Sequence, residues 1–302
     1  MTSQTSGNNR VITAIVISLV LAALNMNASE TNLPAFQLLA SRRPLVIGHR
    51  GYCQFAPENT LPSFQLAMAA GADLVELDYH HSKDGQLIVI HDHELDRTTD
   101  ATNRWAQKKI GVQTKTAAEI QSLDAGSWFD PKYAGTRIPL LAEALDTIQA
   151  GSVTLIERKA GPPADCIQLL REKKLINKVV VQSFDWEYLR AFHEQASEQV
   201  LGALGPTDRL AGGNKPTGVT KDLSAAWLDE LQKTGAKLVV WNQKVSREAV
   251  HLAHQQRLRV WVYTVDDPAL ANELLDMGVD GIITNNTSLI WKAIALRSQK
   301  AP

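Results

Sequence analysis

Cysteine is scarce in this sequence, since Cys53 and Cys166 are the only two among 302 residues. Two cysteines this far apart lack the spacing of a zinc site, so the sequence has no cysteine-based zinc motif. In an exported protein the two thiols could form a disulfide. Two unrelated thiols are the other interpretation, and the sequence leaves both open.

An excess of charge of one sign is also absent. The 31 Lys and Arg residues nearly balance the 32 Asp and Glu residues, which leaves a net charge of −1. A balanced chain has no general affinity for nucleic acid or for an anionic membrane surface. The seven tryptophans do not interleave with basic residues. We therefore expect no nucleic-acid partner.

A long uncharged apolar segment occurs only near the N-terminus, and it is short for a membrane span. Arg10 precedes the apolar run Val11–Leu24, and small residues follow at Ala28 and Ser29. A membrane helix needs about 20 apolar residues, whereas this layout is typical of a secretory signal. We predict a signal peptide over residues 1–28 and an exported protein, periplasmic or secreted. An uncleaved anchor holding the protein outside the membrane, or a buried N-terminal helix, are the alternatives.

Apolar, β-branched segments alternate with amphipathic segments over the rest of the chain. The predicted strands begin at Leu45, Leu74, Val153, Val179, Val200, Leu238, Val260 and Gly281. The predicted helices include Leu61–Ala70, Ile167–Lys174, Trp186–Gln195, Ser224–Thr234, Arg247–Gln256 and Pro268–Met277. This alternation is typical of parallel α/β folds, and a TIM (β/α)8 barrel has eight such strands. We predict one barrel domain over residues 40–300.

One interval between predicted strands is much longer than the others. After the second strand the chain turns at Asp84-Gly85 into a short added strand, Leu87–His91, and a polar stretch follows. Long stretches of this kind in a compact domain are usually functional loops or small subdomains. We predict an insertion after the second strand, at about 94–139, above the catalytic end of the barrel.

Three carboxylates come at or near strand ends. Glu76 and Asp78 are two residues apart on one predicted strand, so both side chains project to the same face. Paired carboxylates repel each other unless a cation neutralises them. Glu157 ends the next barrel strand. Oxygen ligands suit a hard divalent cation, Ca²⁺ or Mg²⁺, so we predict that Glu76, Asp78 and Glu157 bind one.

Two histidines and two positively charged side chains accompany the carboxylates. His49 ends the first strand and His91 ends the added strand, and two imidazoles can supply a general base and a general acid near neutral pH. Which histidine is the acid does not follow from the sequence. Arg50 and Lys159 are the predicted phosphate-binding residues, since a guanidinium or an ammonium binds phosphate oxygens.

Four short segments combine in an arrangement that is specific: His49-Arg50-Gly51, Pro57-Glu58-Asn59-Thr60, Glu76-Leu77-Asp78 and His91-Asp92. Together they resemble the glycerophosphodiester phosphodiesterase family, over nearly the whole chain after the leader. The resemblance implies hydrolysis of a small glycerophosphodiester to sn-glycerol 3-phosphate and an alcohol. It also implies that His49 and His91 are the catalytic pair and that Glu76, Asp78 and Glu157 hold the metal. The family favours attack by the substrate's own hydroxyl, through a cyclic phosphate.

The chain departs from the family pattern at three positions. Arg158 stands where an apolar residue is usual, Asn285 follows Thr284 where the family commonly has Asp, and Tyr263 often corresponds to Trp. We expect Arg158 to point outward, and the change at position 285 weakens any role for that residue. Trp261 and Tyr263 either wall the substrate pocket or belong to the core.

Two other functions remain as alternatives. A lysophospholipase D or another phospholipid phosphodiesterase would need an apolar rim for a longer lipid. A non-catalytic barrel that binds phosphodiesters would not need both histidines and all three carboxylates, which this chain retains. Neither the leaving alcohol nor the oligomeric state follows from the sequence.

Overall fold

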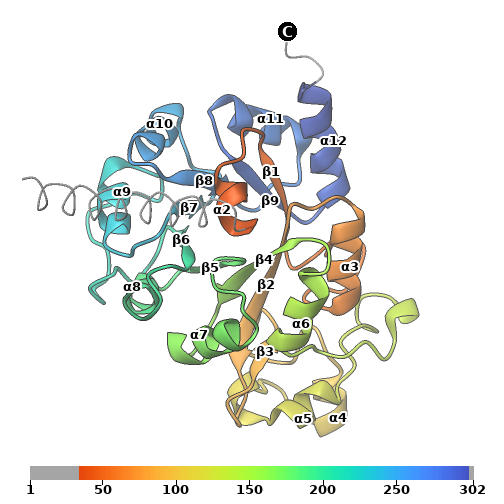
Figure 1. Ribbon diagram of the computed structural model, residues 1–302. Helices are drawn as coiled ribbons and strands as arrows, with labels where there is room; N and C mark the ends of the chain where they lie inside the picture. The colour runs from red at the N-terminus through yellow and green to blue at the C-terminus, as the bar shows by residue number, and fades with distance from the viewer. Residues whose placement is uncertain (1–33, 299–302) are drawn as a thin grey trace, which may run out of the picture.

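Eight parallel strands close into a barrel in the computed structural model of the chain, which describes residues 34–298 (Figure 1). The strands are β1 (Leu45–Gly48), β2 (Leu74–His81), β4 (Val153–Arg158), β5 (Val180–Ser183), β6 (Val200–Gly205), β7 (Leu238–Trp241), β8 (Arg259–Val262) and β9 (Gly281–Thr284). Neighbours along this order pair in parallel, and β9 pairs with β1 to close the ring. The predicted TIM barrel is confirmed, with strand starts shifted by one residue at β5 and β8.

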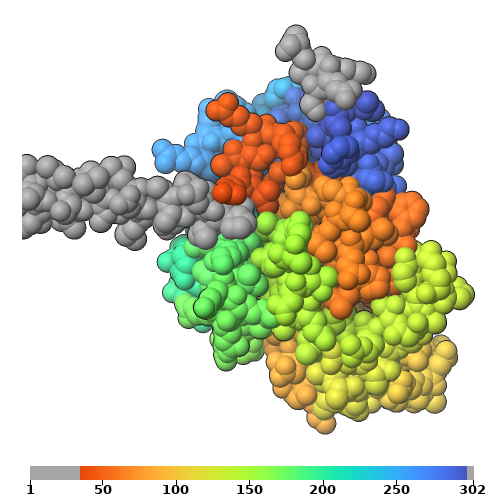
Figure 2. All heavy atoms as spheres, turned by 45° about the vertical axis from the view of Figure 1, so that its right-hand side comes forward, coloured from red at the N-terminus to blue at the C-terminus, as the bar shows by residue number. Residues whose placement is uncertain are grey.

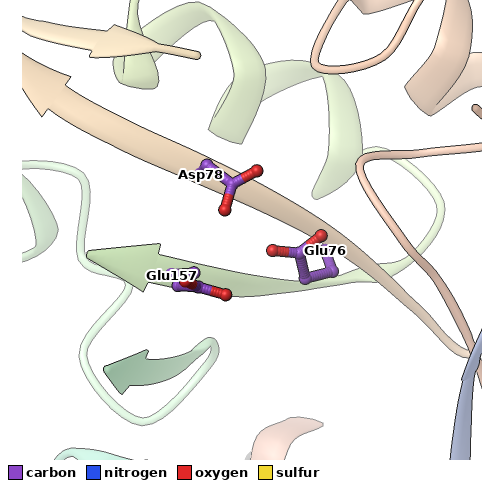
Figure 3. Close-up of side chains that lie close together, drawn as sticks. All are labelled: Glu76, Asp78 and Glu157. Carbon is purple, nitrogen blue, oxygen red and sulfur yellow. The ribbon is translucent and has the colours of Figure 1, made fainter. Parts of the chain in front are cut away.

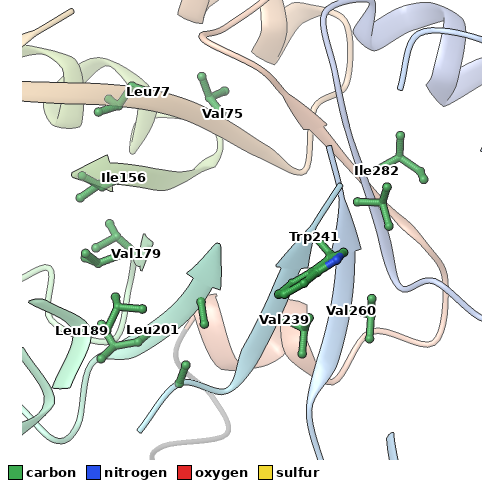
Figure 4. Close-up of a cluster of buried hydrophobic side chains, with 14 of the residues drawn as sticks. Val75, Leu77, Ile156, Val179, Leu189, Leu201, Val239, Trp241, Val260 and Ile282 are labelled. Carbon is green, nitrogen blue, oxygen red and sulfur yellow. The ribbon is translucent and has the colours of Figure 1, made fainter. Parts of the chain in front are cut away.

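Helices surround the ring of strands. They are α3 (Leu61–Ala69), α6 (Leu141–Ile148), α7 (Pro163–Glu172), α8 (Trp186–Gln195), α9 (Ala225–Gln232), α10 (Arg247–Gln255), α11 (Pro268–Asp276) and α12 (Thr287–Ser298). In α6 the buried side chains recur at Leu141, Ala144, Leu145 and Ile148, which is the spacing of one helix face. Such faces pack against the outward residues of the strands and form the main core (Figure 4).

The interior of the barrel forms a second apolar layer. Leu74 of β2 and Leu155 of β4 point inward, while the residues that follow them, Val75 and Ile156, face the helices. At the amino-terminal end, α2 (Pro34–Leu39) packs against this layer through Ala35. The alternation along β2 continues to Glu76 and Asp78, which therefore share the interior face of Leu74 at the opposite end.

A small subdomain follows β2. It begins with β3 (Leu87–Val89), antiparallel to β2, and continues through α4 (Ala101–Trp105), η1 (Val112–Thr114), α5 (Ala117–Gln121) and η2 (Pro131–Tyr133). Its buried residues, among them Leu95, Ile110 and Ile120, form a separate core. Its atoms, in yellow, form a lobe at one end of the molecule in Figure 2. The added strand is shorter than predicted and leaves His91 beyond its end.

Three sequence predictions concern export and the cysteines. The predicted signal peptide, residues 1–28, lies outside the described residues and stays a prediction. The predicted domain limits, residues 40 and 300, also stay predictions. Within residues 34–298, no helix combines the length and apolar character needed to cross a membrane. Cys53 and Cys166 are both free thiols, so the structure favours two unrelated cysteines.

Candidate active site

Three buried carboxylates face one another across β2 and β4 (Figure 3). Glu76 and Asp78 lie on β2, and Asp78 is the register partner of Glu157 on β4. One oxygen atom from each side chain lies within 4.8 Å of the other two. Their exposures are only 1, 1 and 6 %. The structure therefore brings the three predicted ligands together in a group that could hold a metal ion.

Burial and mutual repulsion act on these carboxylates. Burial raises the pKa of Glu76 well above its usual value, and the charges of Asp78 and Glu157 raise it further. Burial also raises the pKa of Glu157 to about 7, although Lys159 opposes this rise. Burial acts against ionisation of Asp78 too, but Lys159, His91 and Arg50 hold its pKa below the usual value. Additional positive charge beside Glu76 and Glu157 would therefore lower the pKa of both groups.

The two predicted phosphate-binding cations contact this carboxylate group. Lys159 Nζ lies 3.1 Å from Asp78 Oδ1 and also contacts Glu157 Oε1. Arg50 Nε lies 3.5 Å from Asp78 Oδ2, and the Arg50 backbone N–H donates to Glu76 Oε2 at 2.7 Å. Arg50 adopts a left-handed φ of 52°, which costs a non-glycine residue about 1–3 kcal/mol. Hydrogen bonds at both backbone groups hold this conformation, since the Arg50 carbonyl oxygen also accepts from Ser63 Oγ at 2.9 Å.

His49 follows β1 and contacts a residue that follows β9. Its Nδ1 lies 2.7 Å from Asn285 Oδ1. An amide oxygen only accepts hydrogen bonds, so Nδ1 carries the proton and Nε2 has the free lone pair. Burial, followed by the charge of Arg50, lowers the pKa of His49 to about 4. His49 is therefore a neutral imidazole at physiological pH.

His91 has an ionised partner instead. Its Nδ1 donates to Asp92 Oδ1 at 2.8 Å, and burial lowers its pKa while the charge of Asp78 opposes this. Arg97 holds Asp92 through Nε at 2.7 Å and Nη2 at 2.9 Å. The same guanidinium donates to both oxygens of Glu58, which also accepts from Arg50 Nη1. The two histidines thus differ in the charge of the group behind them.

Arg97 was missed by the sequence analysis, and so was the role of Asn59. Asn59 Nδ2 donates to Asp78 Oδ2 at 2.8 Å, and the Asp78 backbone N–H donates to Asn59 Oδ1. The neighbouring Thr60 side chain bonds Pro57 O and caps no helix. The Pro-Glu-Asn-Thr motif was the only signal for Asn59. No pattern in the sequence indicates a partner for Arg97.

The comparisons with known proteins agree on one family. The model of the "Glycerophosphoryl diester phosphodiesterase family" matches residues 49–289. The chain is 33 % identical over 307 residues to a glycerophosphodiester phosphodiesterase of Bacillus subtilis (strain 168), covering 94 % of this chain and 97 % of that protein. The chain belongs to the glycerophosphoryl diester phosphodiesterase family. The predicted family and enzyme class, a glycerophosphodiester phosphodiesterase, are therefore confirmed.

Two solved phosphodiesterase structures resemble this barrel. A phosphodiesterase of Oleispira antarctica, in complex with the product sn-glycerol-3-phosphate, has a TM-score of 0.73 and 27 % identity, covering 85 % of this chain and 99 % of that one. A glycerophosphodiester phosphodiesterase of Agrobacterium tumefaciens str. C58 has a TM-score of 0.67 and 27 % identity, covering 82 and 98 %. The family assignment thus extends to the three-dimensional arrangement.

Two departures from the family pattern now have structural explanations. Arg158 points outward as expected, donates to Gly161 O and Asp185, and lies over the ring of Tyr188 at 4.7 Å. It therefore packs between β4 and α8. Asn285 is the direct hydrogen-bond partner of His49, so this departure lies at the site itself.

Three further histidines, His80, His81 and His93, have different surroundings. His80 is buried on the same face of β2 as Asp78, and its Nε2 bonds His91 O at 3.1 Å. His93 is exposed and stacks edge-to-face with His80 at 4.9 Å. His81 points outward to Ala160 O and Asp165. His80 thus supports the backbone of His91, whereas His81 lies on the outer face of the barrel.

A cavity of about 500 Å³ opens beside Glu157 and Lys159. The rest of its lining is mostly charged or polar and comprises His93, Arg158, Ser183, Phe184, Asp185, Asp208, Arg209, Gly213 and Lys215. Tyr263 packs edge-to-face on Phe184 at 5.9 Å and donates to Gly205 O, whereas Trp261 is buried in the barrel interior. Of these aromatic residues, Phe184 lines the cavity directly.

Proposed function

We propose that this protein hydrolyses glycerophosphodiesters to sn-glycerol 3-phosphate and an alcohol, with a divalent cation and two histidines. The observation that carries the proposal is the meeting of three carboxylates, two cations and two differently supported histidines at one end of the barrel. Arg50, Asp78 and Lys159 act electrostatically on both His49 and His91. Both imidazoles therefore border the same charge cluster.

A divalent cation fits the carboxylate group. Within the described part of the chain, no hydrogen-bond donor reaches the buried Glu76 Oε1. A buried carboxylate oxygen without a partner is costly, and coordination to a cation would satisfy it. Three carboxylates suit Ca²⁺ or Mg²⁺. When bound, the cation would neutralise developing charge on the phosphoryl oxygens.

His49 is assigned as the base and His91 as the acid. His49 is neutral with a free Nε2, so it can take the proton of the attacking hydroxyl, from either the glycerol or water. His91 is supported by the Asp92 carboxylate, which stabilises the imidazolium form. This support opposes the burial that lowers the pKa of His91, and the protonated His91 can give its proton to the leaving alkoxide. The P–O bond to the nucleophile forms as the P–O bond to the alcohol breaks. Attack by water gives sn-glycerol 3-phosphate directly, whereas attack by the glycerol hydroxyl gives a cyclic phosphate, which a water must then open to the same product.

Arg50 and Lys159 would bind the phosphodiester. Lys159 is paired with Asp78 and Glu157. A cation at these carboxylates would replace its attraction and free the ammonium for a phosphoryl oxygen. The guanidinium of Arg50, held by Glu58, would add a directional donor.

The cavity lining favours a small polar leaving group over a lysophospholipid. An acyl chain would need a continuous apolar surface, and Phe184 is the large apolar side chain in this lining. The exposed aromatic residues Phe55 and Trp128 are not among its residues. A purely binding role does not need an acid and a base with separate partners, so it has less support.

A direct assay tests the proposal. Purified protein should release sn-glycerol 3-phosphate from glycerophosphocholine or glycerophosphoethanolamine with Ca²⁺ or Mg²⁺, and cleave lysophosphatidylcholine far more slowly. A His49→Ala preparation, purified in the same way, controls for contaminating activity. If no glycerophosphodiester is cleaved with either cation, the proposal fails. Preference for lysophosphatidylcholine would favour the lipid alternative.

Arg97 should influence turnover through Asp92 and Glu58. Replacing it with alanine removes four charge-assisted hydrogen bonds and frees Asp92, so His91 loses a fixed partner. We expect kcat to fall on the order of tenfold, less than for loss of a direct acid or base. The exposed Arg104 of the same subdomain provides the control, as Arg104→Ala. Unchanged kcat in Arg97→Ala would show that Asp92 does not need this support.

A further inference from the structure

The amide of Asn285 bonds three different side chains at the edge of the site. Its Oδ1 accepts from His49 Nδ1 at 2.7 Å and from the Cys53 thiol at 2.9 Å. Its Nδ2 donates to Asp266 Oδ2 at 2.7 Å. Asp266 lies after β8 and Asn285 after β9, so adjacent strand ends supply the pair.

The orientation of this amide follows from what Asp266 can do. Asp266 Oδ1 accepts from the Asn285 backbone N–H at 2.7 Å and from Thr284 Oγ1 at 2.9 Å, which fixes the carboxylate. An ionised carboxylate only accepts hydrogen bonds, so the NH₂ group of Asn285 must face it. A flipped amide would place its oxygen against Asp266 and its NH₂ against Cys53 and His49. The oxygen therefore faces His49.

We infer that Asp266 is a positioning residue which, by fixing the Asn285 amide, holds His49 in the tautomer with its proton on Nδ1. Nε2 is then free to accept a proton from the nucleophile. The inference rests on the proposed function, because it assigns a purpose to the Nε2 lone pair. Asn285 acts here as a neutral acceptor, which the neighbouring carboxylate keeps in one orientation.

The substitution Asp266→Asn tests this orientation. The new amide oxygen would keep the bonds from Thr284 and the Asn285 backbone, so its NH₂ would face the Asn285 side chain. Asn285 would then turn its oxygen toward position 266 and its NH₂ toward His49, which favours a proton on Nε2. We expect kcat on glycerophosphocholine to fall about tenfold or more, since a general base contributes roughly 100- to 10,000-fold. KM should change by less than about threefold, because no group that would bind substrate is altered.

Nitrogen-15 spectra of the full chain provide a readout independent of activity. The chain has eight histidines, and the His49 signals are identified by their loss in His49→Ala. In the wild type we expect a protonated Nδ1 and an unprotonated Nε2. In Asp266→Asn the protonated nitrogen should be Nε2. A distinct outcome is that the wild type cleaves no glycerophosphodiester while Asp266→Asn still moves the His49 proton from Nδ1 to Nε2. In that case the proposed function fails and the positioning inference stands.

A reversed pair and a neighbouring acid complete the test. In Asp266→Asn/Asn285→Asp, the introduced carboxylate accepts from His49 Nδ1 while the introduced amide donates to it. We expect the Nδ1–H tautomer to return and kcat to recover to within about threefold. Asp267→Asn, at the neighbouring position where the side chain caps α11 by accepting from Ala269 N–H, should match the wild type. Wild-type kcat and tautomer in Asp266→Asn, or a loss of kcat without a change of tautomer, would overturn the inference.

Discussion

Replacing His49 or His91 with alanine is expected to lower kcat by roughly 100- to 10,000-fold, the usual contribution of a general acid or base. Both side chains lie at the open end of the barrel, outside the apolar core clusters. The melting temperature should therefore change little. The two losses should not add fully, since groups that act as a unit are non-additive. His251→Ala, on the exposed face of α10, is the matched control.

The leaving group distinguishes the acid from the base. A p-nitrophenyl phosphodiester releases a stable anion that needs almost no protonation. His91→Ala should therefore regain much of its activity on that ester, because its partner Asp92 marks it as the proton donor. His49→Ala should stay impaired, since the nucleophile still needs its proton removed. Recovery of His49→Ala instead would reverse the two roles, and near wild-type turnover of both variants on glycerophosphocholine would refute the pair.

Removing the divalent cation is expected to abolish activity and to lower the melting temperature. A ligand that binds only the folded state stabilises it by mass action, and each kcal/mol shifts the melting temperature of a domain this size by about 2–4 °C.

The stabilisation of the fold by the cation should increase with pH. In cation-free protein the raised pKa values of Glu76 and Glu157 favour the protonated forms at low pH. As the pH rises through about 7, Glu157 ionises at a cost. Stabilisation by Ca²⁺ or Mg²⁺ should thus grow from pH 5 to pH 8.

The substitution Glu76→Gln should separate the charge from the shape of the site. Without cation at pH 8, the variant should melt at least as high as the wild type, because a neutral amide cannot repel Asp78 and Glu157 and offers them a hydrogen-bond donor. With cation, the rise in melting temperature and the activity should both be largely lost. Glu198→Gln, an exposed acid, should behave as the wild type. Full activity in EDTA, or an undiminished cation-induced rise in Glu76→Gln, would rule out this metal site.

Local chemistry was sufficient to predict several parts of the molecule. The period of two along a strand places Glu76 and Asp78 on one face and Leu77 on the other, whatever the neighbouring strands are. The alternation of apolar strands and amphipathic helices along the chain indicated a parallel barrel, because a helix between two strands returns the chain to the same end of the sheet. Strand-end positions then predicted that Glu157 would join the acidic pair, because parallel strands all end at the same side of the barrel.

Contacts between distant segments were decided only by the tertiary structure. Asp78 is paired with Glu157 through the register of β2 and β4, which no local pattern specifies. Arg97 reaches Glu58 and Asp92 because the subdomain folds on its own core beside the barrel.

Closure of the ring decides the environment of His49. The sequence identified His49 as a candidate acid or base, since its motif is local. Its tautomer depends on Asn285, which is 236 positions away and becomes a neighbour only when β9 pairs with β1. A residue type limits the proton transfers that a side chain can perform. The partner that selects one of them is set by packing, because hydrogen bonds act over about 3 Å regardless of distance along the chain.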